Sequence, residues 1–156
     1  LTQSFYSESF KFTIVRNPYD RAVSLFHYLR LHRKNWTFQD WVKHLYANRC
    51  EIPPNTTLNV TSAHPDVPRR DLNNQWNLMS SWIPKDVDKI YKFELGLLAA
   101  VNDIRCMRGQ EPLTKVVRAN VSHHKPYRSY YDEDTRKMIY EIYRDDFDRF
   151  GYSEAL

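Results

Sequence analysis

A strand followed at once by a helix start constrains the fold of this chain more than any other feature of its sequence. Residues 11–15 (KFTIV) are β-branched and aromatic, which predicts a short buried strand. Asn17 and Pro18 end that strand and suit the cap and the first turn of a helix, with Asp20 completing a near capping box. The predicted helix has one apolar face, formed by Ala22, Val23, Phe26 and Leu29.

The same order of elements recurs later in the chain. Residues 88–93 (DKIYKF) predict a second strand, which runs into a helix that ends at Gly109 and Pro112. Two more helices are predicted, one capped by Thr37 and one from about residue 132 to residue 150, capped by Gly151. Repeated strand-to-helix order predicts an α/β fold, helix-rich, with a small parallel sheet in a single domain over residues 1–156.

Residues 50–74 are rich in Pro, Asn and Thr and predict a long loop. Cys50 and Cys106 could form one bridge, but two buried thiols are the expectation for a domain of this size. Neither cysteine has metal-ligand neighbours, and no His pair has ligand spacing with an acidic partner, so no metal site is predicted. The sequence lacks a run of eighteen apolar residues, so no membrane-spanning segment is predicted.

Four Asn-X-Ser/Thr acceptors occur, at Asn35, Asn55, Asn59 and Asn120. They hint at passage through the secretory pathway, and coincidence in an Asn-rich sequence explains them equally well. The net charge of +4 favours anionic partners, with phosphate, sulfate, acidic sugars and nucleic acid all open.

Arg16 follows the first predicted strand, at the place where open α/β sheets bind ligands. Its guanidinium could bind a phosphate bidentately, and Ser24, about two helical turns into the next helix, could bind the same phosphate. Arg21 adds positive charge nearby. The alternative is that Arg16 pairs with an acid such as Glu94 and that Ser24 is a small packing residue.

The segment IVRNPYDRAVS resembles the 3′-phosphate-binding segment of the sulfotransferases that use 3′-phosphoadenosine 5′-phosphosulfate (PAPS). Three later segments resemble Golgi-type carbohydrate sulfotransferases and their bacterial relatives, namely NNQWNLMSSWIP (73–84), DKIYKFELG (88–96) and YRSYYDEDTRKMIYEIYRDDFDRFGY (127–152). The middle segment departs from many relatives, because Gln75 stands before Trp76 where they have His. The resemblance implies the sulfotransferase type of P-loop-NTPase-like sheet.

The resemblance also implies roles for individual residues. Arg16 and Ser24 would hold the 3′-phosphate of the nucleotide, while Lys125 and Arg128 of SHHKPYR are further candidates for it. A solvated basic loop explains the latter two as well. The general base is unassigned, and His123 and His124 are candidates only by their place near the predicted site, with polar surface as the alternative.

The family's 5′-phosphosulfate-binding loop, with its lysine, and its usual general base lie upstream of the segments matched here. The resemblance therefore predicts the C-terminal two-thirds of a longer domain. It implies PAPS as donor, a hydroxylated acceptor, expected to be a carbohydrate, and no nucleic-acid partner. The compartment stays open: it would be the cytoplasm for a bacterial protein and the Golgi lumen for a eukaryotic one. The oligomeric state stays open as well.

Three hypotheses follow. The first is a PAPS-dependent sulfotransferase. The second is a binding module, either a nucleotide-binding remnant without catalysis or a basic, aromatic-rich nucleic-acid binder with a contiguous basic face. The third is a structural fragment of a longer enzyme, which would leave apolar residues exposed beside the strand at 11–15.

Overall fold

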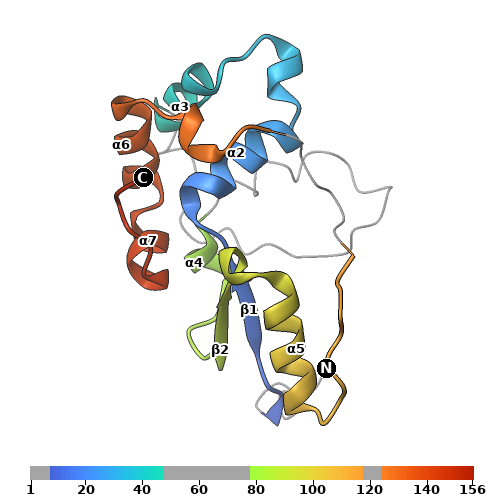
Figure 1. Cartoon of the computed structure of the whole chain (residues 1–156). Helices are drawn as coiled ribbons and strands as arrows, with labels where there is room; N and C mark the ends of the chain where they lie inside the picture. The colour runs from blue at the N-terminus through green and yellow to red at the C-terminus, as the bar shows by residue number, and fades with distance from the viewer. Residues whose placement is uncertain (1–7, 48–77, 118–123) are drawn as a thin grey trace, which may run out of the picture. The chain divides into compact units, whose positions relative to one another are not determined.

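The computed structural model describes residues 8–47, 78–117 and 124–156, which form two compact units (Figure 1). Unit 1 comprises Leu1–Asn17 and Ile83–Val121, and unit 2 comprises Pro18–Trp82 and Ser122–Leu156. The predicted loop at 50–74 lies outside the described residues. No helix in the described ranges is long and apolar enough to cross a membrane.

Unit 1 contains the sheet. Strands β1 (Phe12–Val15) and β2 (Lys89–Lys92) pair in parallel, with Phe12 opposite Lys89 and Val15 opposite Lys92. The parallel pairing of two strands that lie far apart in the sequence confirms the predicted small parallel sheet, which has two strands within the described residues.

A helix follows the second strand. The chain leaves β2 through a short 3-10 turn, η4 (Phe93–Leu95), and enters α5 (Leu97–Met107), which lies beside the strands in Figure 1. Asp103 of α5 accepts hydrogen bonds from Lys89 and Tyr91 of β2, the former at 2.6 Å. Polar contacts therefore tie this helix to the sheet.

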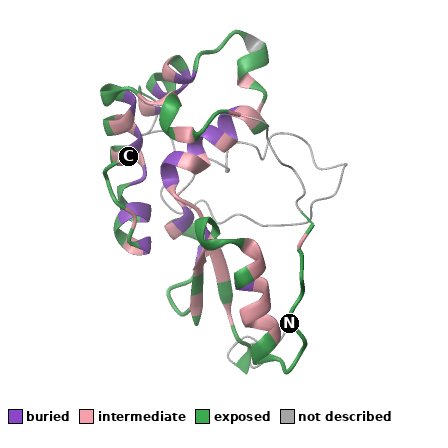
Figure 2. Ribbon diagram, in the orientation of Figure 1, coloured by how far each residue is buried: buried purple, intermediate pink, exposed green. Residues whose placement is uncertain are grey.

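Unit 2 is helical and holds most of the buried residues (Figure 2). Its elements are α2 (Pro18–Tyr28), η1 (Leu31–Lys34), α3 (Phe38–Ala47), α4 (Met79–Trp82), η5 (Tyr127–Tyr130), α6 (Glu133–Ile142) and α7 (Arg144–Phe150). The apolar faces of α2, α3, α6 and α7 meet in one core of Tyr19, Ala22, Val23, Leu25, Phe26, Phe38, Trp41, Val42, Leu45, Ile139, Tyr143 and Phe147. The predicted apolar face of the helix after Pro18 thus lies in this core, although Leu29 is only partly buried.

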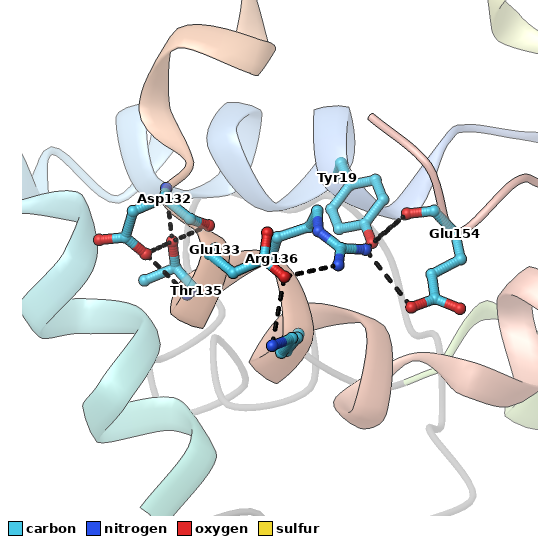
Figure 3. A network of polar contacts seen from close by, with 7 residues as sticks. Tyr19, Asp132, Glu133, Thr135, Arg136 and Glu154 are labelled. Carbon is cyan, nitrogen blue, oxygen red and sulfur yellow. Dashed lines mark hydrogen bonds and ion pairs between the residues drawn. The ribbon is translucent and has the colours of Figure 1, made fainter.

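Helix caps define the starts of α3 and α6. The Thr37 hydroxyl accepts the Asp40 N–H at 3.1 Å, as the sequence predicts. At α6 the Asp132 carboxylate accepts the Thr135 N–H at 2.8 Å, and the Thr135 hydroxyl accepts the Asp132 N–H at 3.1 Å. This reciprocal capping box is drawn in Figure 3.

The prediction of one continuous C-terminal helix over 132–150 is wrong. The helix is divided at Tyr143, whose backbone (φ −110°, ψ 22°) departs from helical values, into α6 and α7. The bend places both the Tyr143 ring and the Asp146 carboxylate in the interior, where each has specific partners. Gly151 ends α7 with φ 61°, as predicted.

The structure bears on two other expectations, one about the cysteines and one about the glycosylation acceptors. Cys106, expected to be buried, is exposed near the end of α5, and Cys50 lies outside the described residues. Among the glycosylation acceptors, Asn35 is exposed, while Asn55, Asn59 and Asn120 lie outside the described residues.

Candidate functional site

Arg16 stands directly after β1, at the carboxyl end of the strand. Its guanidinium carbon lies 5.0 Å from the centre of the Phe93 ring, which follows β2. The neighbouring Glu94 accepts the Asn17 N–H at 2.5 Å, so the Glu94 carboxylate binds the backbone of the turn. The residues after both strands therefore gather at one edge of the parallel sheet, the edge where open α/β sheets bind ligands.

Ser24 lies in the middle of α2 and is half-buried. Among the hydrogen bonds between described residues, none uses its hydroxyl, whereas serine within a helix often bonds back to a carbonyl one turn earlier. The hydroxyl is therefore available to a ligand on this part of the helix.

The sequence suggests that Arg21 adds positive charge near the phosphate site, but in the structure its guanidinium is paired inside unit 2. Its guanidinium forms an ion pair with Asp146 at 3.7 Å and lies 5.5 Å from the centre of the Tyr143 ring. Because Asp146 is completely buried, the positive charge of Arg21 is compensated inside unit 2. Arg21 therefore connects α2 to α7.

Asp146 is a structural residue that sequence reasoning missed. Its two carboxylate oxygens accept the backbone N–H groups of Met79 and Ser80, both at 2.7 Å, at the start of α4. A signal was present, because Asp146 falls on the apolar stripe of the C-terminal helices, between Tyr143 and Phe150. A carboxylate at such a position indicates a buried polar partner.

Residues 124–131, which we call the basic segment, carry three of the predicted site residues. Lys125 and Arg128 have exposed side chains, and the Arg128 guanidinium carbon lies 5.7 Å from the centre of the Tyr127 ring. His124 contacts the Lys125 carbonyl through Nδ1 at 2.7 Å. His123 lies outside the described residues.

Helix α2 holds this segment through His27. The Nε2 atom of His27 lies 2.9 Å from the Tyr130 hydroxyl, and the His27 ring stacks on the His124 ring with centres 5.1 Å apart. Burial lowers the pKa of His27 below its ordinary value of 6.5, and the neighbouring His124 and His32 lower it further. The Ser24 helix and the segment of Lys125 and Arg128 are thus packed together in unit 2, whereas Arg16 belongs to unit 1.

Burial shifts the pKa of two tyrosines, Tyr131 at the end of the basic segment and Tyr143 between α6 and α7. Tyr131 donates its hydroxyl hydrogen to the Tyr19 carbonyl at 2.8 Å, and burial raises the Tyr131 pKa well above 10.0. Burial also raises the pKa of Tyr143 to about 12. Both phenols are therefore neutral at pH 7, with Tyr131 as a hydrogen-bond donor and Tyr143 as a packing group of the core.

The family model described as the Sulfotransferase family matches residues 1–153. The chain belongs to the sulfotransferase family. The match extends over both units and includes the strand end of Arg16, the helix of Ser24 and the basic segment. No curated protein and no solved structure matches the chain.

For this sulfotransferase, membership supports transfer of a sulfuryl group from a donor to an acceptor as the general activity. In the described residues no group of three or more His, Cys, Asp or Glu side chains could hold a metal ion. The assignment of Arg16, Ser24, Lys125 and Arg128 to the donor stays a prediction.

Proposed function

We propose that this chain binds PAPS through Arg16 and Ser24 and transfers its sulfuryl group to a hydroxyl of a carbohydrate or similar acceptor. One observation carries the proposal: the segment IVRNPYDRAVS of a sulfotransferase family member spans a strand end, a turn and a helix start. This local structure suits an anion along the flank of the helix, because Arg16 follows the carboxyl end of a parallel strand and Ser24 lies about two turns into the helix.

The chemistry of the residues fits a phosphate. The Arg16 guanidinium offers paired N–H donors to two phosphate oxygens, and the Ser24 hydroxyl offers one more donor. Lys125 and Arg128 add exposed positive charge, and within the described residues neither forms an ion pair with a carboxylate. These four residues would hold the nucleotide end of PAPS, away from the sulfate.

Sulfuryl transfer breaks the bond between sulfur and the leaving phosphate oxygen and forms a bond between sulfur and the acceptor oxygen. The acceptor proton passes to a base, and positive charge stabilises the leaving phosphate. We assign the donor-holding part of this reaction to Arg16 and Ser24, and His124 is a candidate for the base by position alone.

Exposed apolar residues on the sheet support the prediction of a longer domain. Phe12 of β1 is 46% exposed and Ile90 of β2 is 39% exposed, and Phe10 and Phe93 nearby are exposed as well. Parallel sheets are ordinarily buried on both faces, so further structure is expected to cover these residues. This exposure is what the hypothesis of a fragment of a longer enzyme predicts, and under the present proposal the further structure completes the sulfotransferase domain.

Part of the aromatic content is not accessible for the base stacking that the nucleic-acid alternative requires. Phe26, Phe38 and Trp41 belong to the core of unit 2, so they cannot stack on bases. Other aromatic residues are exposed, among them Phe10, Phe12, Trp36 and Trp82.

Calorimetric titration with PAP, the desulfated nucleotide, tests the proposed site. The parent should bind PAP, and Arg16→Ala should weaken binding about 10- to 100-fold because charge-assisted hydrogen bonds are lost. Ser24→Ala should weaken it about three- to tenfold. Arg33→Ala and Ser81→Ala, which change exposed residues, are matched controls and should bind as the parent does.

A transfer assay with radiolabelled PAPS and a panel of hydroxylated acceptors then tests catalysis. Turnover supports the enzyme, while PAP binding without turnover across the panel supports a nucleotide-binding remnant. No PAP binding by the parent, or unchanged binding by Arg16→Ala, would show that the site assignment is wrong.

A further inference from the structure

The basic segment is anchored at both of its ends by unit 2. At one end the His124 ring stacks on His27 of α2, with an angle of 22° between the ring planes. At the other end the Tyr130 hydroxyl contacts Nε2 of His27 at 2.9 Å, and the Tyr130 carbonyl accepts a hydrogen bond from Gln39 of α3 at 3.0 Å. His27 therefore contacts both ends of the segment.

The two cations of the segment lie between these anchors. Lys125 and Arg128 are exposed, and no ion pair with a carboxylate of the described residues compensates either charge. Anchoring the backbone on both sides of them limits the positions that their side chains can reach. Cations that are held in place before an anion arrives bind it with a smaller loss of entropy.

Three imidazoles meet at His27. Its ring centre lies 4.9 Å from that of His32 in η1 and 5.1 Å from that of His124. The left-handed backbone of Arg30 (φ 55°) ends the helical path after α2 and brings His32 back beside His27. The titratable groups that face His27 are His32 from η1, and His124 and Tyr130 from the basic segment.

No carboxylate among the described residues bonds to His27, His32 or His124. Protonation of these rings therefore places like charges about 5 Å apart without an internal counter-ion. Partial burial of His27 also lowers its pKa below 6.5 and favours the neutral ring, so the contact with Tyr130 is made by neutral imidazole at pH 7. Acid is expected to weaken the anchor.

We propose that His27 and Tyr130 are positioning residues, which hold the basic segment on α2 and so prepare Lys125 and Arg128 to bind the phosphate of a nucleotide. The proposal rests on the proposed function for its ligand, but the anchoring of the segment can be measured without any ligand. His27 and Tyr130 act through the segment and need not touch the nucleotide.

Hydrogen exchange of the ligand-free chain, followed by mass spectrometry, tests the anchoring. Tyr130→Phe keeps the ring but removes the hydroxyl, and should speed exchange of amides 124–131 about three- to tenfold, with α6 unchanged. Tyr140→Phe is the matched control, because no hydrogen bond among the described residues uses the Tyr140 hydroxyl, and it should exchange as the parent does.

The pH dependence adds a result that loss of packing alone would not produce. After correction for intrinsic exchange rates, the parent should lose protection of residues 124–131 between pH 7.5 and pH 5.5, and His27→Gln should lose much less. If both Tyr130→Phe and His27→Gln exchange residues 124–131 as the parent does, the proposal is wrong. Each variant tests the anchor separately, so a folding defect in one of them leaves the other as the test.

PAP titration tests the consequence for binding. Tyr130→Phe should bind PAP about three- to tenfold more weakly than Tyr140→Phe, at equal thermal stability. Equal affinities of these two variants would overturn the positioning role. If the parent does not bind PAP, the proposed function fails and the nucleotide part of this proposal fails with it, while hydrogen exchange still decides whether His27 and Tyr130 hold the segment.

Discussion

The Asp146 carboxylate caps the backbone at Met79, accepting its N–H at 2.7 Å and that of Ser80 at the same distance. Asp146 also forms an ion pair with Arg21 of α2, so one buried side chain joins α2, α4 and α7. The contact explains why an acid lies on an otherwise apolar helix face.

Replacement of Asp146 should therefore destabilise unit 2. Asp146→Ala leaves two N–H groups and the Arg21 charge without their acceptor, and we expect a loss of about 3–5 kcal/mol in the free energy of unfolding. Urea denaturation measures this loss. Asp148→Ala changes an exposed acid on the same helix and should cost under about 0.5 kcal/mol; equal costs for both variants would contradict the structural role of Asp146.

Stability should fall in mild acid because of His27. Its pKa is lowered in the folded chain, so the unfolded chain binds more protons as the pH falls below 6.5. The stabilisation is fully present above pH 6.5 and decreases toward the lower pKa of folded His27. Urea denaturation between pH 7.5 and pH 5 should show this decrease in the parent, and a smaller decrease in His27→Gln.

The Asp132 carboxylate acts in a more acidic range than His27. The hydrogen bond from the Thr135 side chain lowers the Asp132 pKa below 3.8, and its contribution is lost only as the pH falls below that value. A parent whose stability stays flat between pH 7.5 and pH 5 would contradict the His27 prediction.

The capping box of α6 gives a third prediction. Asp132→Ala removes the acceptor for the Thr135 N–H and should reduce the free energy of unfolding by about 1–2 kcal/mol. Asp134→Ala, an exposed acid in the same first turn, is the matched control and should lose only about 0.3–1 kcal/mol from the helix dipole. Thermal unfolding by circular dichroism compares the two, and a smaller loss for Asp132→Ala would contradict the cap.

Tyr19 should ionise late in alkali. Burial is the main cause that raises its pKa to about 12, and its hydroxyl donates to the Glu154 carbonyl at 2.9 Å. Since the unfolded phenol ionises near 10.0, the folded chain loses this stabilisation as the pH rises above that value. Titration at 295 nm should show one late-ionising phenol fewer in Tyr19→Phe than in the parent, and an unchanged number of late-ionising phenols would contradict this prediction.

Periodicity predicted the elements that are governed by local sequence. The strand at 12–15, the helix after Pro18 and the Thr37 cap follow from neighbouring residues, and each lies where the sequence predicts it. The break at Tyr143 could not be predicted in this way. The apolar spacing continues through it, and its cause lies in contacts with Arg21 and with residues 79–80, far away in the sequence.

The same distinction between local sequence and long-range contacts applies to the candidate site. The motif around Arg16 and Ser24 is contiguous, so sequence alone could nominate those residues. The role of His27 could not be found there, because its partners His124 and Tyr130 lie about a hundred positions away and meet it only through folding. The structure shows a polar contact between His27 and the Tyr130 hydroxyl.

The Asp146 cap also fixes an order of events during synthesis. The N–H groups of Met79 and Ser80 emerge from the ribosome 67 and 66 positions before the carboxylate that receives them. Until Asp146 is made, these groups can bond only to water, so the turn at 79–82 lacks its main anchor. Completion of unit 2 therefore has to wait until α7 has been made, and closure of this long-range contact is a late step in the folding of the unit.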